Sequence, residues 1–368
     1  MSAGNGRRTI LIAGGGTGGH LTPALAIAAA LEAYGHGLEP VLVGAVRGVE
    51  ARILPTRDYR YHLLPSEPIY RRQWWRNVRW PMLAGRLLHG VDELLRAERP
   101  AAVLGTGGYA SAPVVWRAAR GGLPTAIQEQ NAYPGLATRW LSRRVRHVYL
   151  GLPESRRLLR FGSHTQVFDT GNPIVPPTPE RRPQALNLFG LEPAARVLLV
   201  TGGSQGALAI NRAVAGWLEA GGPANACLIW VTGRGTHEEF HRFHRPPRVQ
   251  VIDYLDPMAD GYALADLVIS RAGMMTVAEL CAWGLPSILI PLPTAAADHQ
   301  THNARVLADA GASVLLRQSE LTPPRLGEVA ESLMSEDATR QAMAKRAKAR
   351  GKPEAAQEIV SNLLTLVG

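Results

Sequence analysis

Two segments of the chain share one pattern of hydrophobic and polar positions. Each begins with an apolar run, passes through a glycine-rich turn and continues with apolar residues at helical spacing; the segments cover residues 8–31 and 196–218. A short strand, a glycine turn and an amphipathic helix in this order are typical of the opening of a Rossmann-like unit. Because the pattern occurs twice, we expect two Rossmann-like domains in tandem.

Further apolar runs of strand length follow each opening segment and alternate with helical stretches. They cover residues 40–44, 101–108, 125–131 and 147–151 in the first half, and 227–233, 249–255, 267–273 and 287–292 in the second. Continuous apolar runs are typical of parallel strands that are buried on both faces. The sequence therefore predicts an α/β fold with two doubly wound parallel sheets.

The boundary between the two domains is expected in a proline-rich stretch. Residues 171–183 read GNPIVPPTPERRP and show no apolar periodicity. We therefore expect a first domain over residues 1–172 and a second over 173–349. Helical spacing returns in residues 353–367, and we expect this last segment, 350–368, to pack back on the first domain.

Composition and charge narrow the class of protein. The chain has 40 lysines and arginines against 30 aspartates and glutamates, and this excess favours a polyanionic partner such as a phosphate group, a nucleic acid or an acidic membrane surface. The predominance of arginine over lysine is equally consistent with the base composition of the genome. Cys227 and Cys281 are the only cysteines, which excludes a disulfide scaffold and fits a reducing, cytoplasmic compartment. Glycines and prolines interrupt the long apolar stretches, so we expect neither a signal peptide nor a membrane span.

The first glycine loop covers Gly14–His20. Its glycines match the dinucleotide pattern GxGxxG, but no acidic residue follows the second expected strand until Glu50, which disfavours a nicotinamide site. Backbone N–H groups at the start of a helix still predict an anion site. His20 lies just beyond the last glycine, at the end of a strand, and this position favours a catalytic role over that of an ordinary helix-start residue.

The second domain offers three further groups of candidate ligand-binding residues. In the glycine turn 202–206, Ser204 can donate its hydroxyl to a phosphate. Glu279, early in an expected helix, can accept hydrogen bonds from both hydroxyls of a ribose. The third group is His299, Gln300 and Asn303, which can share one helical face and suit sugar hydroxyls; His299 and His302 lack a carboxylate at metal-ligand spacing, so no metal site is expected.

Residues 68–87 interleave Trp74, Trp75 and Trp80 with five arginines. Aromatic and basic side chains together suit a membrane interface with anionic lipids. They also suit single-stranded nucleic acid, and an amphipathic helix with tryptophans in the core is a third interpretation. We favour an exposed patch over tryptophans in the core.

Together these segments resemble the MurG family of peptidoglycan glycosyltransferases. The resembling stretches are GGTGGHLTPALA, GTGGYASAP, QEQNAYPGLATRWL, TGNPI, TGGSQGALAIN, SRAGMMTVAELCAWGLPSILIPLP and HQTHNA, which span residues 15–304 in this order. The resemblance implies the GT-B fold, in which two Rossmann-like domains face each other across a cleft. The first domain would bind the lipid acceptor and the membrane, and the second would bind UDP-GlcNAc.

The reaction implied by the resemblance is an inverting transfer of GlcNAc from UDP-GlcNAc to the C4 hydroxyl of the muramoyl sugar of lipid I. The product would be lipid II, a precursor of the peptidoglycan that cell shape and division require. No obligatory cofactor is expected, because no Asp-rich metal motif is present. The protein would lie at the cytoplasmic face of the cell membrane as a peripheral protein, with no nucleic acid among its partners.

The resemblance also implies roles for individual residues. His20 would be the base, Glu279 would hold the ribose hydroxyls, and Leu255 would meet the uracil through its backbone. Further donor contacts would come from Thr17, Gly18, Gly19, Asn131, Ser204, Met274, Met275, Thr276 and Gln300, and sugar or acceptor contacts from Tyr109, Glu129, His299 and Asn303.

Two positions depart from the family pattern. Val175 stands where the family usually has arginine, so a positive contact near the diphosphate is missing or comes from another residue. Gln128 stands where the family often has histidine. This second change removes one titratable group from the acceptor side and strengthens the case for His20 as the base.

Other classes of protein remain open. A UDP-GlcNAc epimerase or a lipid glycosyltransferase could share the fold, but an epimerase would need carboxylates around the anomeric carbon and no tryptophan-rich membrane segment. A basic nucleic-acid-binding protein would fit the net charge of +10. Such a protein would have no use for two glycine loops together with Glu279 and Gln300, and we favour the glycosyltransferase.

Overall fold

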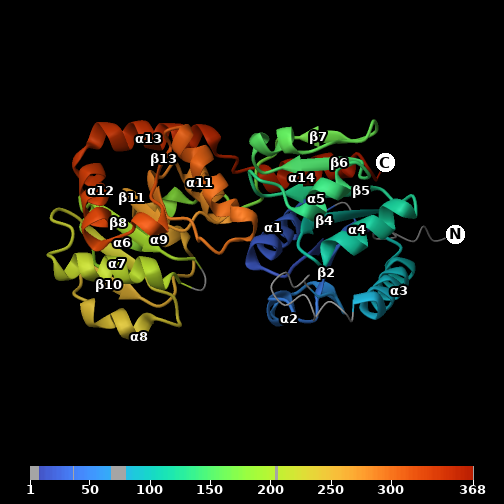
Figure 1. Cartoon of the computed structure of the whole chain (residues 1–368), viewed down its shortest axis with the longest axis horizontal. Coiled ribbons are helices and arrows are strands. Elements are labelled where there is room, and N and C mark those ends of the chain that lie inside the picture. Colours follow the sequence, from blue (N-terminus) through green and yellow to red (C-terminus); the bar gives the residue numbers. More distant parts are fainter. Residues whose placement is uncertain (1–7, 36, 68–79, 204–205, 368) are drawn as a thin grey trace. The chain divides into compact units, whose positions relative to one another are not determined.

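The computed structural model describes residues 8–35, 37–67, 80–203 and 206–367, apart from the side chains of residues 80 and 81. It divides into two compact units, which Figure 1 shows. Unit 1 comprises Met1–Ile174 together with Glu354–Gly368, and unit 2 comprises Val175–Pro353. The C-terminal segment of the chain thus belongs to the same unit as the N-terminal half.

Unit 1 is built on a parallel sheet of seven strands in the order β3-β2-β1-β4-β5-β6-β7. The strands are β1 (Arg8–Gly14), β2 (Leu38–Ala45), β3 (Arg60–Leu64), β4 (Ala102–Gly107), β5 (Thr125–Glu129), β6 (His147–Leu150) and β7 (Gln166–Phe168). The strand order reverses between β1 and β4. In open α/β sheets this topological switch point, at the carboxyl ends of the strands, is where ligands bind.

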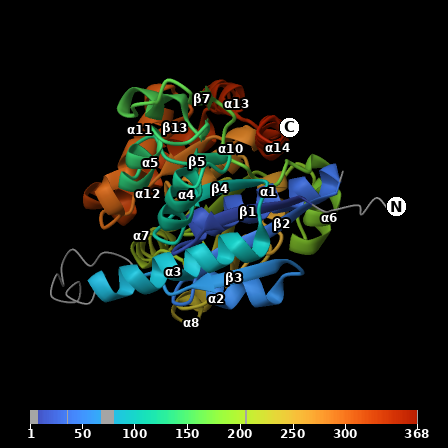
Figure 2. The same cartoon turned by 90° about the vertical axis from the view of Figure 1, so that its right-hand side faces the viewer.

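Helices cover both faces of this sheet. They are α1 (Gly18–Tyr34), α2 (Glu50–Ile53), α3 (Trp80–Glu98), α4 (Ser111–Arg120), α5 (Leu136–Leu141) and α14 (Ala355–Leu364), with the short helices η1 (Leu54–Thr56) and η3 (Pro153–Leu158). Alternate residues of β1 enter opposite cores: Ile10 packs with α1 and α14, whereas Leu11 packs with α3 and α4. Figure 2 shows unit 1 with α3 toward the reader.

Unit 2 contains a parallel sheet of six strands in the order β10-β9-β8-β11-β12-β13. The strands are β8 (Val197–Thr201), β9 (Cys227–Val231), β10 (Val249–Ile252), β11 (Leu267–Ser270), β12 (Ser287–Leu289) and β13 (Ser313–Leu315). The helices are α6 (Arg182–Phe189), α7 (Leu208–Glu219), α8 (His237–Phe240), α9 (Ala259–Leu264), α10 (Met274–Trp283), α11 (His299–Asp309), α12 (Pro323–Ser335) and α13 (Asp337–Arg350), with η4 (Pro179–Arg181), η5 (His241–Phe243), η6 (Ala296–Asp298) and η7 (Gln318–Glu320). The expected α/β class with two parallel sheets is confirmed.

Three strands have no counterpart in the apolar runs of the sequence, namely β3, β7 and β13. Each lies at an edge of its sheet and is partly exposed. Their partly exposed residues do not form the continuous apolar run that marks a strand buried on both faces, whereas β10, which is also an edge strand, is largely buried and has such a run.

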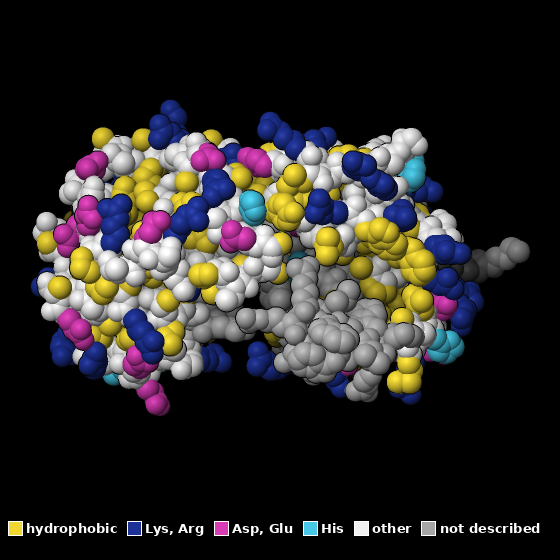
Figure 3. Space-filling model, in the orientation of Figure 1, with side chains coloured by type: hydrophobic (Ala, Val, Ile, Leu, Met, Phe, Trp, Pro, Cys, Tyr) yellow, Lys and Arg dark blue, Asp and Glu magenta, His cyan; other side chains and the backbone are white. Residues whose placement is uncertain are grey.

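The length and apolarity of the helices are relevant to the membrane hypothesis, and the distribution of charged side chains is relevant to the nucleic-acid hypothesis. Within the part of the chain that the structure describes, no helix is long and apolar enough to cross a membrane. On the face shown in Figure 3, lysine and arginine side chains are scattered over each unit among acidic ones and do not form a single continuous strip.

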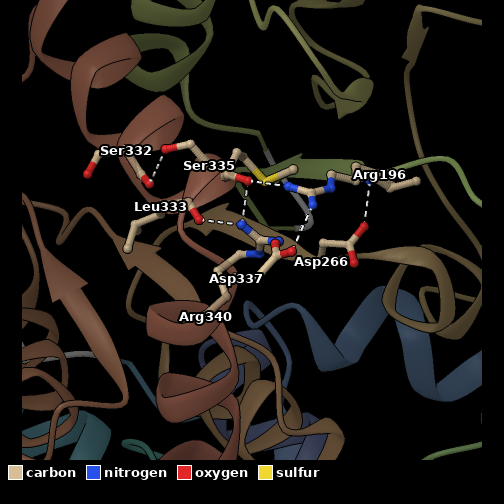
Figure 4. Close-up of polar contacts among 9 residues, drawn as sticks. Arg196, Asp266, Ser332, Leu333, Ser335, Asp337 and Arg340 are labelled. Atoms are coloured by element: carbon tan, nitrogen blue, oxygen red, sulfur yellow. Dashed lines mark hydrogen bonds and ion pairs between the residues drawn. The ribbon is translucent and has the colours of Figure 1, made fainter.

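A buried arginine ties the end of α12 to α13 (Figure 4). Arg340 is 8% exposed and donates to the carbonyls of Leu333 and Met334 and to the carboxylate of Asp337. Arg196 donates to the Met334 carbonyl at 2.7 Å and to Asp337 at 2.9 Å. The last carbonyls of a helix have no partner within the helix, so these two guanidinium groups satisfy them.

Replacing Arg340 with methionine is expected to lower the free energy of unfolding by about 1–3 kcal/mol, because buried acceptors lose their donor. The measurement is the midpoint of urea unfolding. Arg325→Met is the matched control, since the ion pair of Arg325 with Glu328 is solvent-exposed and contributes about 0–1 kcal/mol. Equal midpoints for the two variants would show that the junction in Figure 4 contributes no more than a surface pair.

Candidate functional site

The first glycine loop lies at the carboxyl end of β1, at the switch point of the unit 1 sheet. Gly16 has a φ of 92°, and a Cβ there would lie 2.5 Å from the Tyr109 ring. Gly108 has a φ of 81°, and a Cβ there would lie 1.8 Å from the Gly15 carbonyl oxygen. Glycine is needed at both positions because the loops after β1 and β4 are in direct contact.

A buried carboxylate lies beneath this loop. Glu50 is 0% exposed; it accepts a hydrogen bond from the N–H of Ala45 at 2.8 Å and one from the N–H of Gly16 at 2.9–3.0 Å. The Gly16 N–H is therefore not available to an external anion, which narrows the anion site expected here to the start of α1. Sequence reasoning missed this role of Glu50; the glycines at 44 and 48, where a Cβ would overlap its side chain, were the available signal.

His20 lies in the first turn of α1, half-buried against the loop that follows β4. Its Nδ1 is 3.1 Å from the carbonyl oxygen of Thr106, and the Thr106 hydroxyl donates to the His20 carbonyl at 2.8 Å. A carbonyl oxygen can only accept, so the neutral imidazole carries its proton on Nδ1 and its lone pair on Nε2. This is the tautomer in which Nε2 can take up a proton.

A chain of buried amides supports the same carbonyl. Gln130 donates to the Thr106 oxygen at 2.6 Å and to Gln128 at 2.5 Å. Gln128 donates to Asn172 at 2.8 Å, and Asn172 donates back to the Gln130 carbonyl at 3.1 Å. The Thr106 oxygen that orients His20 is thereby also held by Gln130, a role that the sequence does not indicate.

The other predicted residues of unit 1 lie on the neighbouring loops. Thr17, Gly18 and Gly19 are exposed where α1 begins. Glu129 is 3% exposed, and its carboxylate accepts from the backbone and side chain of Asn131, at 3.0 and 3.2 Å, and from the N–H of Gly135 at 3.1 Å. Glu129 thus shapes the loop that presents the half-buried Asn131. Tyr109 packs on the first glycine loop at Gly16, and its contact with ligand stays a prediction.

In unit 2, Glu279 lies in the second turn of α10. It accepts a hydrogen bond at 2.8 Å from the hydroxyl of Tyr262, in α9. Burial raises the pKa of the Glu279 carboxyl, and the hydrogen bond from Tyr262 acts in the opposite direction. Met274, Met275 and Thr276 form the first turn of α10, and Leu255 is buried in the loop after β10.

The sugar-binding candidates lie in α11. Gln300, half-buried, accepts through its side-chain oxygen from the N–H of Leu292 at 2.9 Å, and Nδ1 of His299 is 2.8 Å from the Ala296 carbonyl. Asn303 is 0% exposed and donates to the Ala272 carbonyl at 3.3 Å. Asn303 therefore links α11 to the loop before α10, and ligand contacts of all three candidates stay predictions.

Some predicted residues cannot be placed. Ser204, Trp74 and Trp75 lie outside the described residues, and so does the side chain of Trp80. Among the residues that are described, no group of three or more histidines, cysteines, aspartates or glutamates could hold a metal ion.

An apolar groove in unit 1 was not foreseen from the sequence. Its volume is about 220 Å³, and it is lined by Ala84, Leu87, Leu88, Ala112, Pro113, Trp116 and Trp140, from α3, α4 and α5. Trp140 is 44% exposed. Arg120 lies over the Trp116 ring at 5.8 Å, and Arg144 lies over the Trp140 ring at 4.5 Å. We call the seven residues that line this groove the apolar face.

The two halves of the chain match the two domain models of one protein family. The glycosyltransferase family 28 N-terminal domain matches residues 10–150, and the glycosyltransferase family 28 C-terminal domain matches residues 197–359. A protein from Chlorobaculum parvum, named UDP-N-acetylglucosamine--N-acetylmuramyl-(pentapeptide) pyrophosphoryl-undecaprenol N-acetylglucosamine transferase, is 40% identical over 97% of this chain and 99% of its own length. A protein of the same name from Moorella thermoacetica is 38% identical with the same coverage, 97% and 99%.

Solved structures agree with this match. MurG from Acinetobacter baumannii superposes with a TM-score of 0.78 at 27% identity, over 97% of this chain and 99% of that one. The UDP-GlcNAc 2-epimerase from Neisseria meningitidis reaches a TM-score of 0.65 at 13% identity, over 97% and 100% of the two chains. The second likeness concerns the fold alone.

Proposed function

This chain belongs to glycosyltransferase family 28 and to the MurG family within it, and from this membership we propose what its own residues do. It is an N-acetylglucosaminyltransferase that moves GlcNAc from UDP-GlcNAc to lipid I, giving lipid II for peptidoglycan synthesis. The observation that carries the mechanism is the hydrogen bond between Nδ1 of His20 and the Thr106 carbonyl.

We propose that Nε2 of His20 is the general base of an inverting displacement. The C4 hydroxyl of the muramoyl sugar gives its proton to Nε2 as its oxygen attacks the anomeric carbon of GlcNAc. The new C–O bond forms while the bond from that carbon to the UDP oxygen breaks, and UDP leaves with the bonding electron pair. Histidine suits this step because its ordinary pKa lies near neutral pH.

The negative charge that grows on UDP needs stabilisation, and we propose that unit 2 supplies it through helix N-termini. Within the described helices, neither α7 nor α10 has an acidic residue in its first turn, so the positive end of each helix dipole is not neutralised locally. Backbone N–H groups at such ends stabilise a leaving diphosphate. Charge stabilisation from this source is the reason we propose no obligatory metal or other cofactor.

Donor recognition is assigned to the residues around α10 and α11. We propose that Glu279 accepts hydrogen bonds from the ribose hydroxyls, that Leu255 contacts the uracil, and that Gln300 reads the GlcNAc hydroxyls. The guanidinium of Arg271 makes hydrogen bonds within unit 2. It donates to the carbonyls of Ile290 and Pro291 at 3.1 Å each and to Gln318 at 2.7 Å. Arg271 therefore braces the loops from which α10 and α11 begin.

We further propose that the protein docks on the cytoplasmic face of the cell membrane through the apolar face. The acceptor carries an undecaprenyl chain that stays in the bilayer, so the enzyme must reach its sugar from the surface. Tryptophans beside arginines suit the headgroup region of anionic lipid. Trp74, Trp75 and Trp80 precede or begin α3 in the sequence, and we propose that they also contact the membrane.

Replacing Trp140 with serine is expected to weaken binding to vesicles with anionic lipid about tenfold, since less apolar surface enters the membrane. Co-sedimentation with vesicles measures this. Leu188→Ser is the control, because Leu188 is 61% exposed but lies in unit 2. Activity on a short, water-soluble acceptor should survive in both variants. Equal vesicle binding by the two variants would rule out the apolar face as the docking surface.

The reaction itself is tested by incubating the protein with UDP-GlcNAc, with and without a lipid I analogue. We expect release of UDP and a disaccharide product only when the acceptor is present. Epimerisation of UDP-GlcNAc without acceptor would support the epimerase instead. Binding to nucleic acid that UDP does not affect would support the nucleic-acid-binding alternative.

A further inference from the structure

One short helix, α9, contacts two of the proposed donor-binding residues, Glu279 and Leu255. Tyr262, in α9, is 5% exposed, and its hydroxyl donates to Oε2 of Glu279 at 2.8 Å. The Tyr262 ring also packs on Trp283, at 6.0 Å between ring centroids. In the same helix, a Cβ on Gly261 would lie 2.8 Å from the Leu255 side chain. The helix therefore touches both Glu279 and Leu255.

The position of α9 is held by two arginines from the proline-rich segment at the start of unit 2. Arg181 makes a bidentate ion pair with Asp260, at 2.7 and 3.1 Å, and Asp260 is buried. Arg182 donates to the Ala263 carbonyl at 2.8 Å. These bonds lie on either side of Tyr262 in the helix. A six-residue helix has little stability of its own, so these external bonds are needed to keep the Tyr262 hydroxyl in place.

The hydrogen bond from the Tyr262 hydroxyl also affects the ionisation of the Glu279 carboxyl. Burial raises the pKa of this carboxyl, which disfavours the ionised form, and the Tyr262 hydroxyl opposes that effect. Burial raises the pKa of Tyr262 well above its ordinary value, so the hydroxyl keeps its proton and remains a donor. Oε2 is occupied by this bond, whereas Oε1 accepts no hydrogen bond from any residue that the structure describes.

We propose that Tyr262 is a positioning residue for the nucleotide: by binding Oε2, it holds the Glu279 carboxylate so that Oε1 points to the ribose hydroxyls. This inference rests on the proposed role of Glu279 in donor binding. Tyr262 itself does not touch the ribose. Its contribution reaches the ligand only through Glu279.

Tyr262→Phe removes the hydroxyl and keeps the ring packing. Isothermal titration with UDP should show affinity reduced about tenfold, the effect of losing one hydrogen bond to a charged group. The KM for UDP-GlcNAc should rise by a similar factor, while kcat changes less than about twofold. Tyr61→Phe, in unit 1, is the control for loss of a phenol hydroxyl, and it should bind UDP as the parent does.

A double-mutant cycle separates this inference from the proposed function. If Tyr262 acts through Glu279, adding Tyr262→Phe to Glu279→Ala should cause no further loss of UDP affinity. An undiminished effect of Tyr262→Phe in the Glu279→Ala background overturns the positioning role. So does an unchanged UDP affinity in a folded Tyr262→Phe variant that contains Glu279. If instead Glu279→Ala leaves UDP affinity unchanged, the proposed role of Glu279 itself is wrong, and the inference is lost with it.

Discussion

Replacing His20 with alanine is expected to lower kcat by about 10²–10⁴-fold, the usual contribution of a general base. Nε2 carries the lone pair because Nδ1 donates a hydrogen bond to the Thr106 carbonyl. Removal of the imidazole therefore leaves the C4 hydroxyl without a proton acceptor from the protein. UDP binding should persist, because the residues assigned to the nucleotide lie in unit 2. Steady-state kinetics on a soluble acceptor and titration with UDP measure the two effects separately.

The matched control for this variant is His164→Ala, because His164 is an exposed histidine of the same unit. Its kcat should equal that of the parent. A decrease in kcat of less than about tenfold for His20→Ala would mean that water or another group accepts the proton. A parallel loss of UDP affinity would instead indicate that His20 supports the fold or the donor site.

Replacing Glu279 with alanine is expected to weaken UDP binding by about 2–4 kcal/mol, which is roughly a 30- to 800-fold increase in Kd. The loss reflects two hydrogen bonds from ribose hydroxyls to a carboxylate, partly compensated by water. Titration with UDP measures it. Glu239→Ala is the control, since that glutamate is exposed in unit 2 and lies 3.8 Å from Arg212 in a surface pair.

The pH dependence of UDP binding provides a second check on Glu279. The ionised carboxylate is the form that accepts both hydrogen bonds, so affinity should fall as pH falls through the pKa of Glu279. Because burial raises that pKa, the fall should begin at a higher pH than an ordinary glutamate would cause. Glu279→Gln removes this component and leaves the titration of UDP itself. Identical pH profiles for the parent and Glu279→Gln would show that the carboxylate does not contact the nucleotide.

The local pattern of the chain was sufficient to predict the two sheets. Strands buried on both faces, such as β1 and β8, require continuous apolar residues, and the glycine turn and helix that follow them leave a clear local signature. The strands β3, β7 and β13 lack this signature because they are partly exposed, whereas β10, also at a sheet edge, is largely buried and shows it. Helical and strand periodicity are local properties, and a sequence therefore displays them directly.

The candidate site was predictable only in part. His20 directly follows a glycine after a predicted strand, and Glu279 lies early in the helix that follows another such glycine turn, so the sequence alone singled them out. The sequence did not indicate that Glu50 occupies the Gly16 N–H or that Gln130 supports the Thr106 carbonyl. Such contacts join residues more than twenty positions apart, and hydrogen-bond partners at that separation depend on how the strands and loops pack.

The sequence by itself thus determined the fold class, the family and the residue types at the ends of the central strands. Tertiary structure alone decided which of those residues hold one another: Tyr262 against Glu279, Thr106 against His20, and Trp116 beside Trp140. The physical reason is that apolar periodicity is set by burial of each element separately, whereas the direction of a side chain and its hydrogen-bond partner are set by neighbours that the chain brings together only when it folds.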